Sequence, residues 1–74
     1  MLVQASMHVE TKIAEQFPAR PDLVQQAADE AMKAMTETAA ERNRHVSEAP
    51  RVSEIRDTGL GYVELTFVAD TESD

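Results

Sequence analysis

The decisive stretch of the sequence is Tyr62–Ala69, which reads YVELTFVA. Its apolar side chains recur at every second position, at Val63, Leu65, Phe67 and Ala69. Because successive side chains of a strand point to opposite faces, this period predicts a strand with one buried face. No other strand pattern in the chain is as apolar, so we expect this strand in the middle of a sheet.

Two further periods precede this strand. Residues 2–13 alternate between apolar and polar and predict a first strand, with Val3, Met7, Val9 and Ile13 on one face. A helical period follows, and small apolar residues dominate its buried stripe. Pro21 suits the first turn of this helix, and Asp22 with Gln25 can alternatively form a capping box. We expect the helix to run to about residue 45, where basic residues complement its dipole.

The segment 51–56 is a weaker strand, because Val52 and Ile55 are out of phase, which predicts a bulge or an edge position. Residues 57–61 contain two glycines and predict a hairpin turn. The fold prediction is therefore α+β, a single β-α-β-β domain over residues 1–74. Its three-stranded antiparallel sheet has the order 2-3-1, and one long helix covers one face. Residues 70–74 are expected to form a frayed acidic tail.

Composition restricts the function. A chain of 74 residues builds only a small core, which self-association would supplement. The net charge of −7 repels phosphate backbones and anionic lipid, so we expect no direct binding to nucleic acid or membrane. We predict a cytoplasmic protein, because no signal segment or cysteine is present. Abundant alanine and an excess of arginine over lysine are typical of high-GC bacterial or bacteriophage genomes.

No motif indicates catalysis. The two histidines lie far apart in the sequence, and the serines have no nucleophile-elbow setting. Glu41 and His45 are spaced as an i, i+4 surface pair of the predicted helix. The glycines at 59 and 61 lie between two strands, so they are turn residues and not a phosphate loop. We predict that the protein is not an enzyme, with no catalytic residue, no metal site and no cofactor.

The sheet face that the helix does not cover is the candidate site. Tyrosine and arginine are enriched in protein interfaces, and this face is predicted to carry both of them. An antiparallel sheet can also simply face water there. The predicted interface consists of His8, Val52, Arg56, Tyr62, Glu64 and Val68.

The element order resembles that of the dodecins, small flavin-binding proteins that assemble into hollow dodecamers. The resemblance extends to the helix start at residues 22–27 (DLVQQA) and covers no specific motif. It implies a ligand site formed between subunits. Dodecins stack flavin on a tryptophan early in the second strand, and this chain contains no tryptophan.

The first functional hypothesis is a non-enzymatic, self-associating protein interaction module, a structural or accessory component of an assembly. It associates through either the open sheet face or an exposed strand edge, and two sheets joined edge to edge would form a continuous six-stranded sheet. Its partner is a second copy of the chain or another protein. One alternative is a small-ligand carrier with a site between subunits, as the dodecin resemblance implies. Another is an acidic inhibitor or decoy of a basic host protein, whose binding high salt would weaken.

Overall fold

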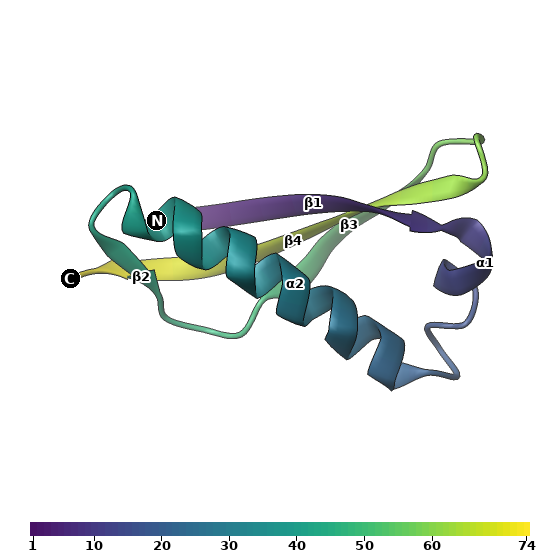
Figure 1. Ribbon diagram of the computed structural model, residues 1–74, viewed down its shortest axis with the longest axis horizontal. Coiled ribbons are helices and arrows are strands. Elements are labelled where there is room, and N and C mark those ends of the chain that lie inside the picture. The colour runs from purple at the N-terminus through teal and green to yellow at the C-terminus, as the bar shows by residue number, and fades with distance from the viewer.

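The computed structural model describes residues 1–74 and has two layers, a helix and a sheet (Figure 1). The elements in chain order are β1 (Leu2–Glu10), α1 (Thr11–Ala14), α2 (Pro21–Ala40), β2 (Arg44–Val46), β3 (Arg51–Asp57) and β4 (Tyr62–Ser73). The predicted α+β class is confirmed. The layout differs in detail, because the antiparallel sheet has four strands and a short helix follows β1.

Strand β4 is the centre of the sheet, as its apolar pattern predicts. It pairs with β1 from Tyr62 opposite Glu10 to Asp70 opposite Leu2. Its other edge pairs with β3 and, further along, with β2. The predicted three-strand order therefore omits β2, which lies on the same side of β4 as β3.

Strand β1 ends at Glu10 and not at residue 13, because its partner ends there. The Thr11 amide donates to the Gly61 carbonyl at 3.1 Å, and beyond this bond β4 turns into its hairpin loop. A strand without a partner leaves its backbone groups unpaired, and residues 11–14 satisfy theirs in helix α1 instead. Ile13 therefore lies on α1, outside the sheet.

Helix α2 begins at Pro21, and Arg20 is its N-cap residue. No side chain caps it, because Asp22 accepts two hydrogen bonds from the Arg20 guanidinium, so the capping-box alternative is wrong. The helix ends at Ala40, earlier than predicted. Asn43 has a φ of 57°, a left-handed conformation that asparagine tolerates and that stops helices. The chain then reverses into β2, which holds Arg44 and His45.

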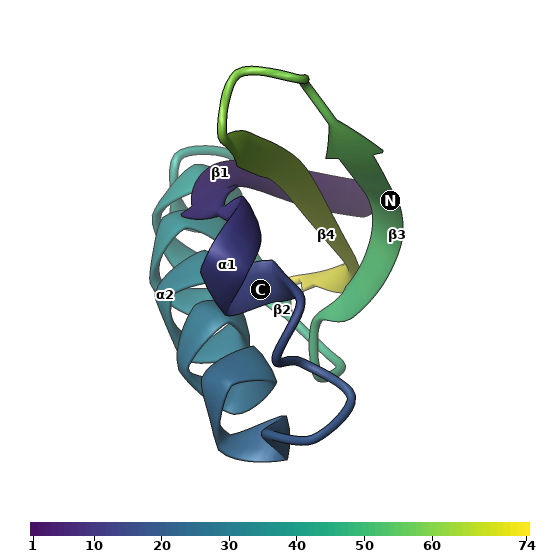
Figure 2. The same ribbon diagram turned by 90° about the vertical axis from the view of Figure 1, so that its right-hand side faces the viewer.

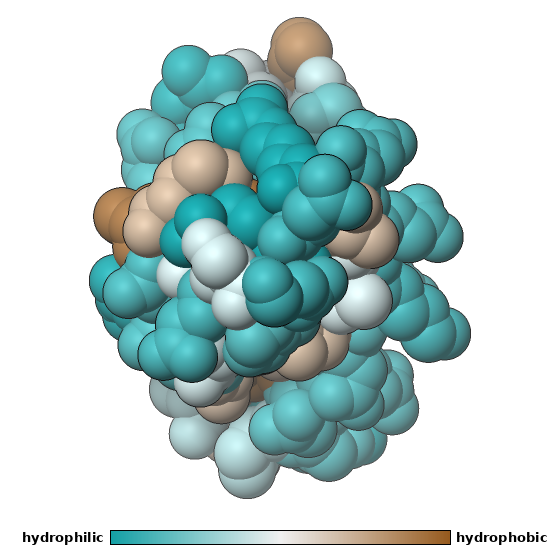
Figure 3. All heavy atoms as spheres, turned by 90° about the vertical axis from the view of Figure 1, so that its left-hand side faces the viewer, coloured by the Kyte–Doolittle hydropathy of each residue, from teal (hydrophilic) through white to brown (hydrophobic).

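The predicted frayed tail is ordered through Ser73 as the end of β4. Thr71 is 3% exposed, and its hydroxyl oxygen accepts a hydrogen bond from Arg44 Nε at 2.7 Å. The same hydroxyl donates to the Met1 carbonyl at 2.8 Å. Short polar side chains thus tie the last residues of β4 to β2 and β1. The end of the molecule where these segments meet is mostly hydrophilic (Figure 3).

The core lies between α2 and the sheet. Alanines bring α2 close to the strands, and the fully buried large side chains are Phe67, Met35 and Leu65. Only 11 of 74 residues are buried, so the core is small, as the length predicts. Figure 2 shows α2 on one side of β1 and β4, with β3 on the far side of β4. Neither helix combines the length and apolar character needed to span a bilayer.

Strand β3 contains the predicted irregularity, a register shift between Val52 and Glu54. Val52 lies opposite Phe67 and Ile55 lies opposite Leu65, so both belong to the helix side of the sheet. The placement of Val52 on the uncovered face is therefore wrong, because the bulge adds a residue and shifts the alternation. The turn after β3 is as predicted, with Gly59 at φ 75° and Gly61 at φ 91°.

We predict that Thr71→Val lowers the free energy of unfolding by about 1–2 kcal/mol, because the Arg44 guanidinium loses a buried acceptor. Urea denaturation measures the change. Glu72→Ala, at an exposed position of the same strand, is the control and should shift stability by less than about 0.5 kcal/mol. Equal effects of the two substitutions would contradict the ordered role of this segment.

The segment between β2 and β3 generates a prediction about acid stability. The Glu48 carboxylate accepts a hydrogen bond of 2.7 Å from the Asp70 backbone amide and also forms an ion pair with Arg51. The hydrogen bond from the Asp70 amide has the largest effect on the pKa of Glu48, and the hydrogen bond from Arg51 has the next largest. Both lower this pKa below its ordinary value of 4.5. The Glu48 carboxylate therefore binds a proton more readily in the unfolded chain than in the folded one. The stabilisation that this carboxylate gives is fully present above the unfolded pKa and is lost as pH falls through the folded pKa.

Glu48→Gln retains the acceptor oxygen and removes the titration. Its unfolding free energy should fall less steeply than that of the wild type between about pH 5 and pH 3. Denaturant melts at a series of pH values measure the two slopes, with the exposed Glu15→Gln as control. Parallel curves for wild type and Glu48→Gln would show that Glu48 does not anchor this connection.

Candidate interaction surface

Three of the predicted interface residues form one row across the uncovered face of the sheet. Arg56, Glu64 and His8 lie opposite one another on β3, β4 and β1. Glu64 is in the middle, and its carboxylate is 3.1 Å from Arg56 Nη2 and 3.7 Å from His8 Nε2. We call these residues the charged row. Tyr62 flanks it, with its ring centroid 4.6 Å from that of His8.

The charged row is a solvated structure. The side chains of His8 and Arg56 are 63% and 61% exposed, so solvent screens their attraction to Glu64. What it offers chemically is an ordered line of hydrogen-bond donors and acceptors, which ends at β3 with the guanidinium of Arg56.

The remaining two predicted residues are separate from the charged row. Val68 lies on the same face, opposite Gln4 and Arg51, and is half-buried. Between Val68 and the charged row, Thr66 and Ser6 share a hydrogen bond of 2.9 Å between their hydroxyls. Val52 is on the opposite face of the sheet. The structure thus brings together His8, Glu64, Arg56 and Tyr62, but not the whole predicted set.

Strand β3 is the most exposed part of the sheet. All seven of its residues are exposed, including the apolar Val52 at 40% and Ile55 at 57%. These two side chains lie on the helix side, where the corresponding residues of β4 are buried under α2. Glu54, on the opposite face, has no ion-pair partner within the chain, whereas Arg56 contacts Glu64. The edge of β3 thus combines uncovered apolar groups with charges.

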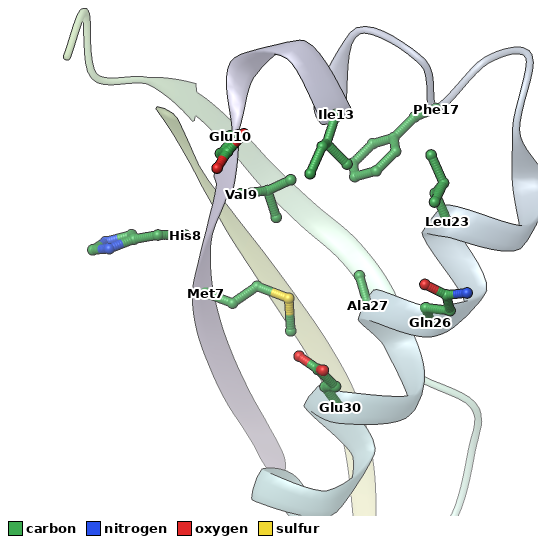
Figure 4. A pocket seen from close by; sticks show the side chains of 10 residues that line it. All are labelled: Met7, His8, Val9, Glu10, Ile13, Phe17, Leu23, Gln26, Ala27 and Glu30. Carbon is green, nitrogen blue, oxygen red and sulfur yellow. The ribbon is translucent and has the colours of Figure 1, made fainter. Parts of the chain in front are cut away.

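A second feature is a pocket of about 330 Å³ between the end of β1, α1 and the start of α2 (Figure 4). Its apolar lining includes Ile13, Phe17 and Leu23, whose side chains gather at one end, whereas His8 points away. Glu10 and Glu30 are also among its lining residues. The sequence prediction missed this pocket because it placed Ile13 in a strand. The i, i+4 spacing of Ile13 and Phe17 is the signal that indicates a helical turn.

The histidines and carboxylates do not converge on a metal site. His45 contacts Asp74 at 2.7 Å and Glu72 at 3.8 Å, across β2 and β4, and not Glu41 as the longer helix predicts. No group of three or more such side chains is placed to hold a metal ion. His45 therefore belongs to the polar contacts that join β2 to the end of β4.

Comparisons with known proteins give no family assignment. No protein-family model matches the chain, and neither the curated proteins nor the solved structures include a match. The proposed function therefore rests on the surfaces described above.

Proposed function

We propose that the protein is a non-enzymatic, self-associating interaction module, a structural or accessory component of an assembly, and that it associates through β3. The observation that carries this proposal is the exposure of Val52 and Ile55 on the face of the sheet that α2 covers elsewhere. Two of the six predicted interface residues, Val52 and Arg56, lie on β3. The charged row connects this strand to His8 and Glu64.

The geometry of the two layers supports the proposal. A helix with its side chains is about 10 Å wide, and neighbouring strands lie about 4.8 Å apart. One helix therefore covers about two strands. Here α2 packs on β1 and β4, and it also contacts β2, the strand that follows it in the chain. The third position across the sheet, β3, keeps its apolar side chains in water. Burying the exposed part of an Ile or Val side chain contributes up to about 1–2 kcal/mol, which a second copy of the chain can supply.

Other surfaces support association less well. The end that carries the termini and β2 is mostly hydrophilic, with small, separate apolar spots (Figure 3). On β1, Val3, Met7 and Val9 pack against the core, and the exposed apolar residue is Leu2, at the first position of the strand and 58% exposed. The uncovered sheet face is polar along the charged row. Strand β3 combines unpaired backbone groups with two exposed apolar side chains on one face, whereas the free edge of β1 has one such side chain, at its start.

We expect light scattering after size exclusion to give a mass above that of one chain, 8.2 kDa, at micromolar to millimolar concentration. Ile55→Lys should give a monomer, because it places a charge in the contact without disturbing a buried residue. Leu60→Lys is the matched control, since Leu60 is an exposed apolar residue of the hairpin loop. Its mass should equal that of the wild type.

Tyr62→Asp tests the competing surface, because Tyr62 lies on the uncovered face away from the edge of β3. Association through β3 predicts that this variant retains the wild-type mass. A monomeric wild type would contradict self-association itself. Dissociation by Tyr62→Asp with no effect of Ile55→Lys would transfer the interface from β3 to the uncovered face.

A second function, carriage of a small apolar ligand, is supported by the pocket beside α1. Its volume of about 330 Å³ lies at the lower end of the range for ligand sites. In this form the site belongs to one chain, in contrast to the site between subunits that the dodecin resemblance implies.

The carrier function predicts that the neutral dye Nile red binds with one site per chain and gains fluorescence. Ile13→Asp, at the partly exposed edge of the pocket, should weaken binding at least fivefold, whereas Leu60→Asp should leave it unchanged. Fluorescence titration measures both affinities. Equal weakening by the two variants, or no binding up to about 100 µM dye, would eliminate this function.

A further inference from the structure

The free edge of β3 has a charge pattern that restricts how it can pair. Within the chain, β3 pairs only with β4, so its other edge presents unpaired backbone groups. Glu54 lies opposite Thr66, and Arg56 lies opposite Glu64, so both side chains are on the uncovered face of the sheet. Ile55, between them, lies on the helix side. Along the edge, a negative side chain (Glu54) is therefore followed by an apolar one (Ile55) and a positive one (Arg56), and the apolar side chain lies on the opposite face from the two charges.

Two identical edges that pair antiparallel are related by a two-fold axis, which passes beside one residue of each strand. Centring the axis on Glu54 places the two Glu54 carboxylates opposite each other, and centring it on Arg56 does the same for the two guanidinium groups. Like charges directly opposite destabilise a sheet. Centring on Ile55 places Glu54 of each copy opposite Arg56 of the other, and the two Ile55 side chains opposite each other.

We propose that two copies of the chain pair antiparallel through β3 about a two-fold axis at Ile55, with Glu54 of each copy opposite Arg56 of the other. This inference rests on the proposed self-association and adds its partner surface and register. It gives Glu54 an ion-pair partner, which it does not have within its own chain. Arg56, whose guanidinium carries five donors, contacts Glu64 of its own chain and Glu54 of the other.

The pairing joins the two sheets into one. The strands β1, β4 and β3 of each copy form a continuous six-stranded sheet, and the two charged rows meet across the axis. The two-fold axis is perpendicular to the sheet, so both α2 helices lie on the same face. The apolar side chains of both β3 strands lie between these helices. The free edge of β1 carries Leu2, Gln4, Ser6, His8 and Glu10 on its uncovered face. Its only pair of opposite sign, His8 and Glu10, requires a protonated His8, whereas Glu54 and Arg56 are both charged at neutral pH.

Charge reversal tests the register. Glu54→Arg gives two Arg–Arg contacts in a homodimer, and Arg56→Glu gives two Glu–Glu contacts, so each variant alone should dimerise at least tenfold more weakly than the wild type. In an equimolar mixture, both arginines of the first variant meet glutamates of the second, so the mixture should form a heterodimer with near wild-type affinity. Sedimentation equilibrium measures the dissociation constants, and circular dichroism verifies that each variant is folded.

Disulfide trapping provides a second readout, because the natural chain contains no cysteine. Opposite residues of antiparallel strands have Cα atoms about 4.5–5.5 Å apart, within reach of a disulfide. Under mild oxidation, Ile55→Cys should form a cross-linked dimer. Val52→Cys, on the same face of β3, should not, because its copies lie about 20 Å apart in this register, about six residue spacings of about 3.3 Å.

The outcomes separate the two proposals. A wild type that stays monomeric at millimolar concentration would overturn self-association and this register together. A wild-type dimer would overturn the register alone if both charge variants dimerise as tightly as the wild type, or if mixing them does not restore affinity. Cross-linking through Val52→Cys but not Ile55→Cys would have the same meaning. Restored affinity on mixing, together with the Ile55→Cys disulfide, would support the proposed pairing.

Discussion

A single helix, about two strands wide, packs on a sheet that is three strands across. Helix α2 places its alanine stripe on β1 and β4, and the buried residues of the sheet lie on those two strands. Strand β3 is left outside this contact, although its pattern continues the apolar side of the sheet. The exposure of Val52 and Ile55 follows from this mismatch between the two layers.

The same mismatch concentrates the features of the proposed interface on one strand. Free β edges tend to pair with other chains, and natural proteins control this tendency with charges and bulges. Strand β3 has both, in Glu54, Arg56 and the register shift after Val52. In the proposed dimer the charges do not prevent pairing but select one register of it. In the charged row, the Glu64 carboxylate contacts the guanidinium of Arg56 at 3.1 Å and so holds it on β3.

Local sequence patterns correctly predicted the elements that depend on neighbouring residues alone. The alternation in residues 62–69 predicted the central strand, Pro21 the helix start, and the glycines of the turn the hairpin. The errors occurred where pairing with a strand distant in the sequence determines where an element ends. Strand β1 ends where β4 leaves it, and β4 continues to Ser73 because β2 pairs with it there. Asn43, which ends the helix region, was a local signal that the basic residues after it obscured.

For the candidate site too, the prediction was correct where local alternation is sufficient and wrong where strand pairing changes it. Simple alternation correctly placed His8, Tyr62 and Glu64 together, since they lie on regular strands. It failed for Val52, because the bulge changes the face of every residue on one side of it. The pocket beside α1 depends on a turn of helix that begins only because the sheet ends. Neither feature is visible in a pattern that treats each strand separately.

Amide hydrogen exchange at two protein concentrations distinguishes pairing through β3 from association through any other surface. Pairing through β3 predicts that, at high concentration, the outward amides of β3 gain protection that they lack on dilution, while the outward amides of β1 exchange rapidly at both. Rapid exchange of the β3 amides in a sample that light scattering shows to be dimeric would contradict this pairing, because the dimer would then use another surface.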